Sequence, residues 1–147
     1  MDFSSEHDSS QSVVTNREDL KKYIVLLYKR IATGEKIQQA PKVILSDNIE
    51  NVNQDPLGKT AYYDPANKLV RVYITGRLIV DILRSFSHEC IHHVQNERGD
   101  FNTNDDNTGT GYAQTNPHLR KMEEEAYLKG SLYLRDFQDE LRKHMGM

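Results

Sequence analysis

Histidine and glutamate side chains with metal-binding spacing lie in the middle of the chain. His88, Glu89 and His92 fit the pattern H-E-x-x-H. On an α-helix, residues four apart lie above one another, so the imidazole rings of His88 and His92 can point at a single metal ion. Glu89 would lie beside that ion as a general base. The pattern therefore predicts a zinc site that activates a water molecule for hydrolysis.

The flanking residues predict the helix that this site requires, over about residues 76–96. Its polar face would carry Asp81, Ser85, His88, His92 and Gln95, and its apolar face would carry Ile79, Leu83, Phe86, Cys90 and Val94. Two such stripes are typical of an amphipathic helix that packs on a core. The alternative is a surface helix whose histidines only face solvent. The next residue, His93, is turned about 100° from His92 and is expected beside the site or at its rim.

A third ligand would come from another part of the chain, because a catalytic zinc ion usually has three protein ligands and one open position. A second helix is predicted over residues 118–143, with Asn116 as its N-cap and Pro117 at its first helical position. Consecutive glutamates occupy positions 123–125. This helix is therefore the predicted source of the third ligand.

Glu125 is the predicted third ligand. It lies between the apolar positions Met122 and Ala126, so its side chain should point toward the core more than that of Glu124, the second candidate. Glu123 is expected to face water.

Other zinc-ligand patterns fit the sequence less well. The metzincin pattern H-E-x-x-H-x-x-G-x-x-H is excluded, because Gln95 and Arg98 occupy the positions of its glycine and its third histidine. Asp100, Asp105 and Asp106 follow the motif closely, but they lie in a stretch rich in Asn, Thr and Gly, which indicates a loop.

The H-E-x-x-H motif, together with the downstream pair Glu125-Ala126, resembles the gluzincin class of zinc metallopeptidases. These are the thermolysin-like proteases, and the chain resembles especially their minimal single-domain relatives. The resemblance covers about residues 41–134. It implies a zinc ion held by His88, His92 and Glu125.

One position departs from the thermolysin-like pattern. Those enzymes have an aspartate four residues after the ligand glutamate, which orients a histidine, whereas this chain has Lys129 there. Asp81 or Asp136 is expected to orient the histidine instead.

The resemblance also implies a reaction, the hydrolysis of a peptide bond by zinc-activated water with Glu89 as the general base. A donor must stabilise the negative charge of the tetrahedral intermediate. Tyr127 and His118 are candidates, and Tyr112, in a glycine-containing stretch, is another. The expected partner is a peptide or protein substrate that adds as a strand to one strand of a small sheet.

The remaining elements predict an α+β, minimal zincin-like domain over residues 16–147. A first helix is expected over residues 16–33, ending at Gly34, followed by a strand at 43–45 and a hairpin of strands at 60–63 and 69–75. The order is an N-terminal helix, a three-stranded sheet, the motif helix, an irregular loop and a long C-terminal helix. Residues 1–15 are polar and serine-rich, which predicts a disordered tail.

Composition narrows the cellular context. The chain has 147 residues, a net charge of −3 and one cysteine. No basic cluster indicates direct contact with nucleic acid, and no signal peptide or membrane-spanning segment is recognised, so a cytoplasmic protein is expected. A single cysteine excludes an internal disulfide, and Cys90 is expected to be a small buried hydrophobe.

Two other functions are compatible with the sequence. The chain could be a zincin-fold structural or binding module with little or no turnover. It could also be a DNA-linked regulatory protease similar to the SprT-like repair proteases, although the mild acidity disfavours direct DNA contact.

Overall fold

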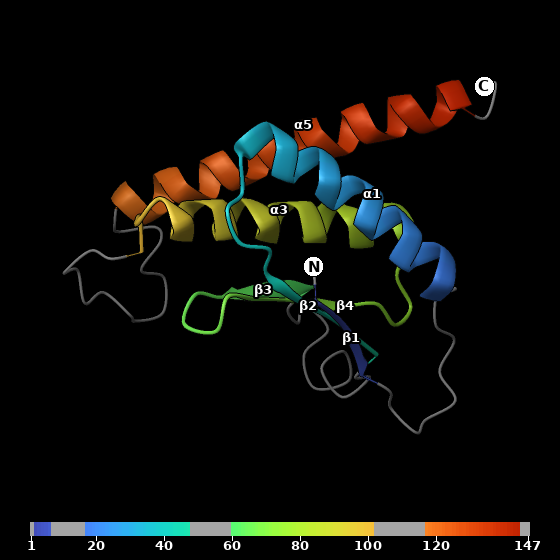
Figure 1. Cartoon of the computed structure of the whole chain (residues 1–147), viewed down its shortest axis with the longest axis horizontal. Coiled ribbons are helices and arrows are strands. Elements are labelled where there is room, and N and C mark those ends of the chain that lie inside the picture. The colour runs from blue at the N-terminus through green and yellow to red at the C-terminus, as the bar shows by residue number, and fades with distance from the viewer. Residues whose placement is uncertain (1, 7–16, 48–59, 102–116, 145–147) are drawn as a thin grey trace.

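The computed structural model describes residues 2–6, 17–47, 60–101 and 117–144. Its elements are β1 (Asp2–Glu6), α1 (Arg17–Glu35), β2 (Lys42–Ser46), β3 (Ala61–Asp64), β4 (Leu69–Tyr73), α3 (Ile79–Glu97) and α5 (Pro117–His144). The helices lie on one side of a small mixed sheet (Figure 1). The predicted α+β class is therefore confirmed.

The sheet has the strand order β1-β2-β4-β3. β2 pairs in parallel with both β1 and β4, whereas β3 and β4 form the antiparallel hairpin expected from the sequence. Alternate side chains of β2 and β4, Val43, Leu45, Val70 and Val72, are fully buried. Because β4 is internal, only β3 of this hairpin has an edge that is unpaired within the described sheet.

The fourth strand, β1, was not predicted. Asp2 to Glu6 pair with Lys42 to Ser46, so the expectation of a disordered tail does not hold for residues 2–6. The sequence of this strand, DFSSE, has no alternation of apolar and polar residues that would indicate a strand. Its pairing uses backbone groups, which any sequence has, at the edge of β2. The rest of the predicted tail lies outside the described residues.

The first helix continues past Gly34, where the sequence predicted its end. α1 ends at Glu35, and the left-handed residue after it is Lys36, with φ 59°. The amide of Ile37 donates to the carbonyl of Ala32, which is the hydrogen bond of a Schellman motif. Gly34 instead gives room to the side chain of Tyr133, which a Cβ at this position would contact.

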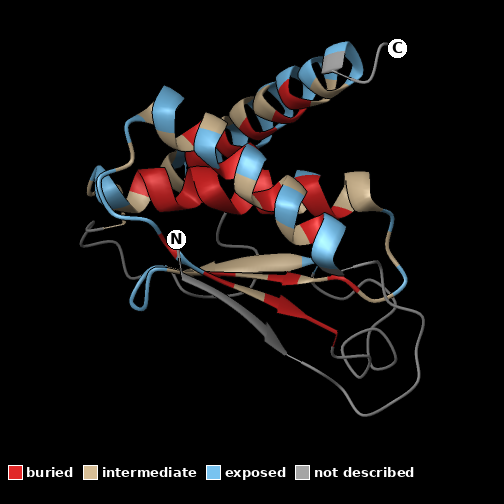
Figure 2. Ribbon diagram, turned by 45° about the vertical axis from the view of Figure 1, so that its right-hand side comes forward, coloured by how far each residue is buried: buried red, intermediate tan, exposed pale blue. Residues whose placement is uncertain are grey.

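α3 is the central helix of the fold. It packs against the sheet on one side and against α1 and α5 on the other, and most of its length is buried (Figure 2). Ile82, Phe86, Cys90 and Ile91 are buried in the core, so the predicted apolar environment of Cys90 is confirmed. None of the helices among the described residues is both long and apolar enough to span a membrane.

α5 approaches α3 closely at Gly130. A Cβ at this position would lie 3.1 Å from the backbone nitrogen of His88 and 3.2 Å from its Cα. The hydroxyl of Ser87 donates to the carbonyl of Gly130 at 2.8 Å. A residue without a side chain therefore lets the two helices touch directly beside the first histidine of the motif.

Replacing Gly130 with leucine should destabilise the protein. The added side chain would meet the α3 backbone, and overpacking of this kind costs about 1–3 kcal/mol. Leucine has the better helix propensity, by up to about 1 kcal/mol, so this gain offsets only part of the loss. Urea denaturation measures the difference. Ser131→Leu, which places the same side chain at the neighbouring exposed position, is the control. Equal stability of Gly130→Leu and the parent would contradict the close approach.

Candidate metal centre

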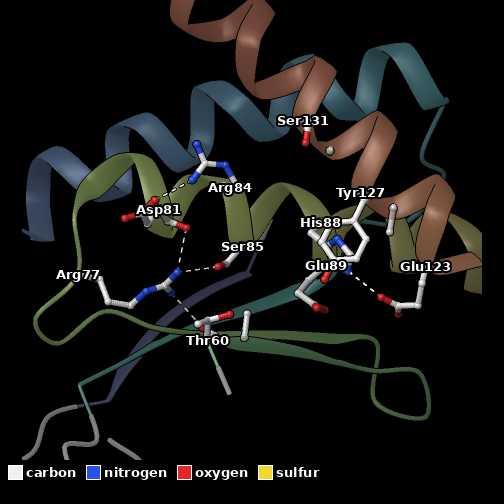
Figure 3. Close-up of a pocket in the computed structure, with 13 residues that line it drawn as sticks. Thr60, Arg77, Asp81, Arg84, Ser85, His88, Glu89, Glu123, Tyr127 and Ser131 are labelled. Carbon is white, nitrogen blue, oxygen red and sulfur yellow. Dashed lines mark hydrogen bonds and ion pairs between the residues drawn. The ribbon is translucent and has the colours of Figure 1, made fainter. Parts of the chain in front are cut away.

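Three potential metal ligands meet where α3 and α5 pack together. The Nε2 atoms of His88 and His92 are 3.2 Å apart. The carboxylate of Glu123 lies 2.8 Å from Nε2 of His92 and 3.3 Å from Nε2 of His88. Figure 3 shows Glu123 on α5 turned toward His88 on α3.

The spacing and chemistry of this set fit a metal ion. Four ligands at about 2.0–2.1 Å in a tetrahedron are separated by about 3.3 Å, close to the separations seen here. The possible ligand atoms are two imidazole nitrogens and a carboxylate oxygen, and all of them lie within 4.8 Å of one another. His88, His92 and Glu123 could therefore hold a metal ion, with His92 buried and the other two half-buried.

The third member of the set is Glu123, not the predicted Glu125. On a helical wheel, the apolar stripe of α5 centres between Met122 and Ala126, and both glutamates lie roughly 80° from that centre, on opposite flanks. The sequence rule that favoured Glu125 applied equally to Glu123. A better signal was Gly130, which is seven residues after Glu123 and therefore lies on the same face, against His88.

Glu125 lies on the other flank of α5 and binds cations. Its carboxylate accepts from Arg98 at 2.6 and 2.9 Å and contacts Lys129 at 3.0 Å. The hydrogen bonds from Arg98 are the largest cause that holds the pKa of Glu125 well below its usual value. Lys129, which replaces the aspartate of the thermolysin-like pattern, is thus a partner of Glu125.

Gln95 orients His92. Its Oε1 lies 2.8 Å from Nδ1 of His92, and its Nε2 donates to the carbonyl of Met122 and to Glu125, both at 2.8 Å. Because both amide hydrogens have acceptors, Oε1 must accept from Nδ1–H, which leaves the lone pair of Nε2 for a metal. Gln95 is fully buried.

The aspartates proposed for this orienting role lie elsewhere. Asp81 pairs with Arg84 at 2.7 Å, and Asp136 is exposed on α5. Asp100, an alternative ligand, has its carboxylate bound by Arg98 at 2.6 Å.

Glu89 is a buried carboxyl group at the candidate centre, with an exposed fraction of 8%. Burial raises its pKa, the charges of His92 and His88 lower it in part, and the charge of Glu123 raises it again. Glu123 differs, because hydrogen bonds from His88 and His92 hold its pKa well below the usual value. The pKa of His92 is raised: burial alone would lower it, and the Glu123 hydrogen bond is the largest of the opposing causes. The environments of the two carboxyl groups therefore act in opposite directions, raising the pKa of Glu89 and lowering that of Glu123.

A cavity of about 710 Å³ opens beside these residues. Thr60 and Ala61, at the start of β3, form one wall, and α5 forms another. Tyr127 lines it, with its ring centroid 4.5 Å from that of His88 and 66% of the residue exposed. Tyr127 thus lies at the site, as its predicted role requires (Figure 3).

His118, another predicted donor, is not brought to this cavity. Its Nε2 lies 2.9 Å from the carbonyl oxygen of Asp100, and it is not among the described residues that line the cavity. Tyr112, Asp105 and Asp106 lie outside the described residues.

His93 is fully buried and belongs to a separate network, not to a rim. Its Nε2 is 2.6 Å from the carbonyl of Gln39 and must donate to it, so Nδ1 accepts from the hydroxyl of Tyr63 at 2.7 Å. Asn96 donates to the same hydroxyl at 2.9 Å. The hydrogen bonds to Tyr63 join α3 to β3, whose Ala61 lines the cavity.

Exchange of the two glutamates for alanine should separate their roles. Glu123→Ala removes a ligand, so metal affinity should fall by more than the roughly 10–100-fold that loss of a ligand's supporting partner typically causes. Glu125→Ala should cause a smaller loss of metal affinity, because it removes only an acceptor of Gln95, which in turn contacts His92. Zinc titration against a chromogenic chelator measures both, with Glu124→Ala on the exposed face as the control. A larger loss in Glu125→Ala than in Glu123→Ala would restore the original prediction.

Gln95→Leu should weaken metal binding by roughly 10–100-fold, because Nδ1–H of His92 loses its acceptor and the ring its orientation. Ser87→Ala is the matched control. It also removes a buried hydrogen bond from α3 to an α5 carbonyl, but that bond does not touch a histidine. If both variants lose the same metal affinity, general loosening of the helix pair explains the effect and the orienting role fails.

Comparisons with known protein families, with curated proteins and with solved structures found no match for this chain. Its resemblance to gluzincins therefore stays a prediction from a few motif residues. What the protein does must be inferred from the chemistry of the site.

Proposed function

We propose that this protein is a zinc-dependent peptidase of the gluzincin type with a minimal zincin-like fold. The observation that supports this most directly is the convergence of His88, His92 and Glu123, with the buried carboxyl of Glu89 beside them at a cavity. Two histidines and a carboxylate are one of the ligand sets of catalytic zinc, and they leave one position open.

Glu89 carries the proton transfers of the proposed reaction. When bound, zinc would supply a Lewis acid that makes a water molecule acidic and polarises a carbonyl group. Glu89 accepts a proton from the water molecule while the water oxygen forms a bond to the carbonyl carbon of the peptide. The same carboxyl then gives that proton to the amide nitrogen as the C–N bond breaks, so the carboxylate is regenerated. Burial favours this role, because it raises the proton affinity of Glu89.

Tyr127 is the proposed donor to the developing oxyanion. Its ring rests against His88, and its large exposed fraction allows it to reorient when a substrate enters. A phenol hydroxyl that donates to the oxyanion stabilises the transition state more than the ground state.

β3 is the proposed docking edge for an extended substrate. The pairing of Ala61 with Val72 leaves the other side of β3 without a neighbour in the described sheet. Since Ala61 also lines the cavity, a peptide added to this edge would run past the candidate metal centre. β4, the alternative edge, is paired on both sides.

Glu89→Gln tests the proposal. This variant should fold, bind zinc as the parent does, and lose about 10²–10⁴-fold in cleavage rate, the usual contribution of general acid–base catalysis. Zinc content, melting temperature and the cleavage of a mixed peptide library, followed by mass spectrometry, are compared with those of Glu124→Gln on the exposed face of α5. Undiminished cleavage by Glu89→Gln would exclude this role, and zinc binding without cleavage by the parent would favour a binding module instead.

A further inference from the structure

The cavity continues beyond the candidate metal centre, along α3 toward its N-terminus. Small residues, Ser85 on α3 with Gly130 and Ser131 on α5, line this part. Arg84 and Asp81 lie at its far end (Figure 3). The cavity therefore offers room for part of a substrate between the metal ligands and a charged end.

Among the described residues that line the far end, two are arginines and one is an aspartate. Asp81 pairs with Arg84 at 2.7 Å, and its backbone carbonyl accepts from Arg77 at 3.0 Å. The carboxylate of Asp81 also interacts electrostatically with Arg77. Two guanidinium groups thus share one carboxylate, which leaves a net charge of +1 among these three residues.

The two arginines differ in their freedom to bind a ligand. Arg77 is held by hydrogen bonds to the carbonyl oxygens of Thr60 and Tyr73 and to the hydroxyl of Ser85, so it joins the sheet to α3. Arg84 is 55% exposed in its side chain, and its ion pair with Asp81 is a solvent-exposed i,i+3 pair, a kind that contributes little stability. Arg84 can therefore exchange Asp81 for another carboxylate, in the two-point geometry that a guanidinium favours.

The position of Arg84 sets the part of the substrate that it would meet. It precedes His88 by one helical turn, about 6 Å along the axis, which corresponds to about two residues of an extended peptide. β3 runs in the same direction as α3, because Thr60 is bound to Arg77 and Tyr63 to His93. A peptide paired antiparallel to β3 would therefore run from the metal ligands toward Arg84, with its C-terminal part at the charged end.

We propose that Arg84 binds a carboxylate of the peptide substrate at the second residue after the scissile bond. The carboxylate is either the side chain of Asp or Glu or the free C-terminus of a substrate that ends there. The inference rests on the proposed peptidase function and names its substrate class, peptides that are anionic at this position.

A binding experiment tests the role of Arg84 without turnover. In the zinc-loaded Glu89→Gln protein, fluorescently labelled, C-amidated alanine-rich octapeptides with one Glu or one Gln are compared by anisotropy. We expect the Glu peptides to bind about tenfold more tightly, a modest factor because Arg84 is half-exposed. Arg84→Gln should abolish this preference. Asp81→Asn should increase it, because the competing carboxylate is lost. Peptides without Glu, labelled away from the C-terminus, are also compared with a free and with an amidated C-terminus. This comparison separates the two sources of the carboxylate, a side chain and a chain end.

Arg142 provides the matched control, because it forms the same exposed i,i+3 pair, with Asp139 at 3.2 Å, on α5 and outside the cavity lining. Arg142→Gln should leave the preference unchanged. In the protein that retains Glu89, Arg84→Glu should shift cleavage toward substrates with Lys or Arg at the second position after the scissile bond. If neither Glu nor a free C-terminus improves binding through Arg84, the inference is overturned even when peptides are cleaved. If the Arg84-dependent preference is found but the parent cleaves nothing, the carboxylate site stands and the peptidase function fails.

Discussion

The direct contact of α5 with α3 at Gly130 is the constraint on which the site depends. Glu123 lies two turns before Gly130 on the same face of α5, so the contact that brings Gly130 against His88 also brings Glu123 to both histidines. The hydroxyl of Ser87 also donates to the Gly130 carbonyl beside this contact, at 2.8 Å. Without this close approach, the H-E-x-x-H motif would have two ligands and no third.

The same packing gives two glutamates of one helical turn different tasks. Glu123 faces the imidazole nitrogens, whereas Glu125 faces the amide of Gln95 and the guanidinium of Arg98. Glu125 thereby supports His92 from behind, through a neutral amide. A histidine whose N–H donates to a neutral amide receives less electron density than one whose N–H donates to an aspartate carboxylate. This centre therefore differs electrostatically from the thermolysin-like pattern that its motif resembles.

The sequence predicted the features that depend on local geometry and missed those that depend on packing. Residues four apart share a face of any helix, so the meeting of His88 and His92 followed from spacing alone. The choice between Glu123 and Glu125 did not, because both flank the apolar stripe of α5 equally and only the position of α3 distinguishes them. β1 was missed since backbone pairing leaves little trace in a polar five-residue segment.

Because the possible ligands lie on two helices, the site is complete only while α3 and α5 stay packed together. His88 and His92 belong to the most buried helix, whereas Glu123 lies near the start of α5, and helix ends are where local opening begins. Each time the first turns of α5 open, the ligand set is broken, and a bound ion opposes that opening by its binding free energy. Amide hydrogen exchange in this part of α5 and the dissociation of a bound ion would therefore depend on the same local opening of the helix.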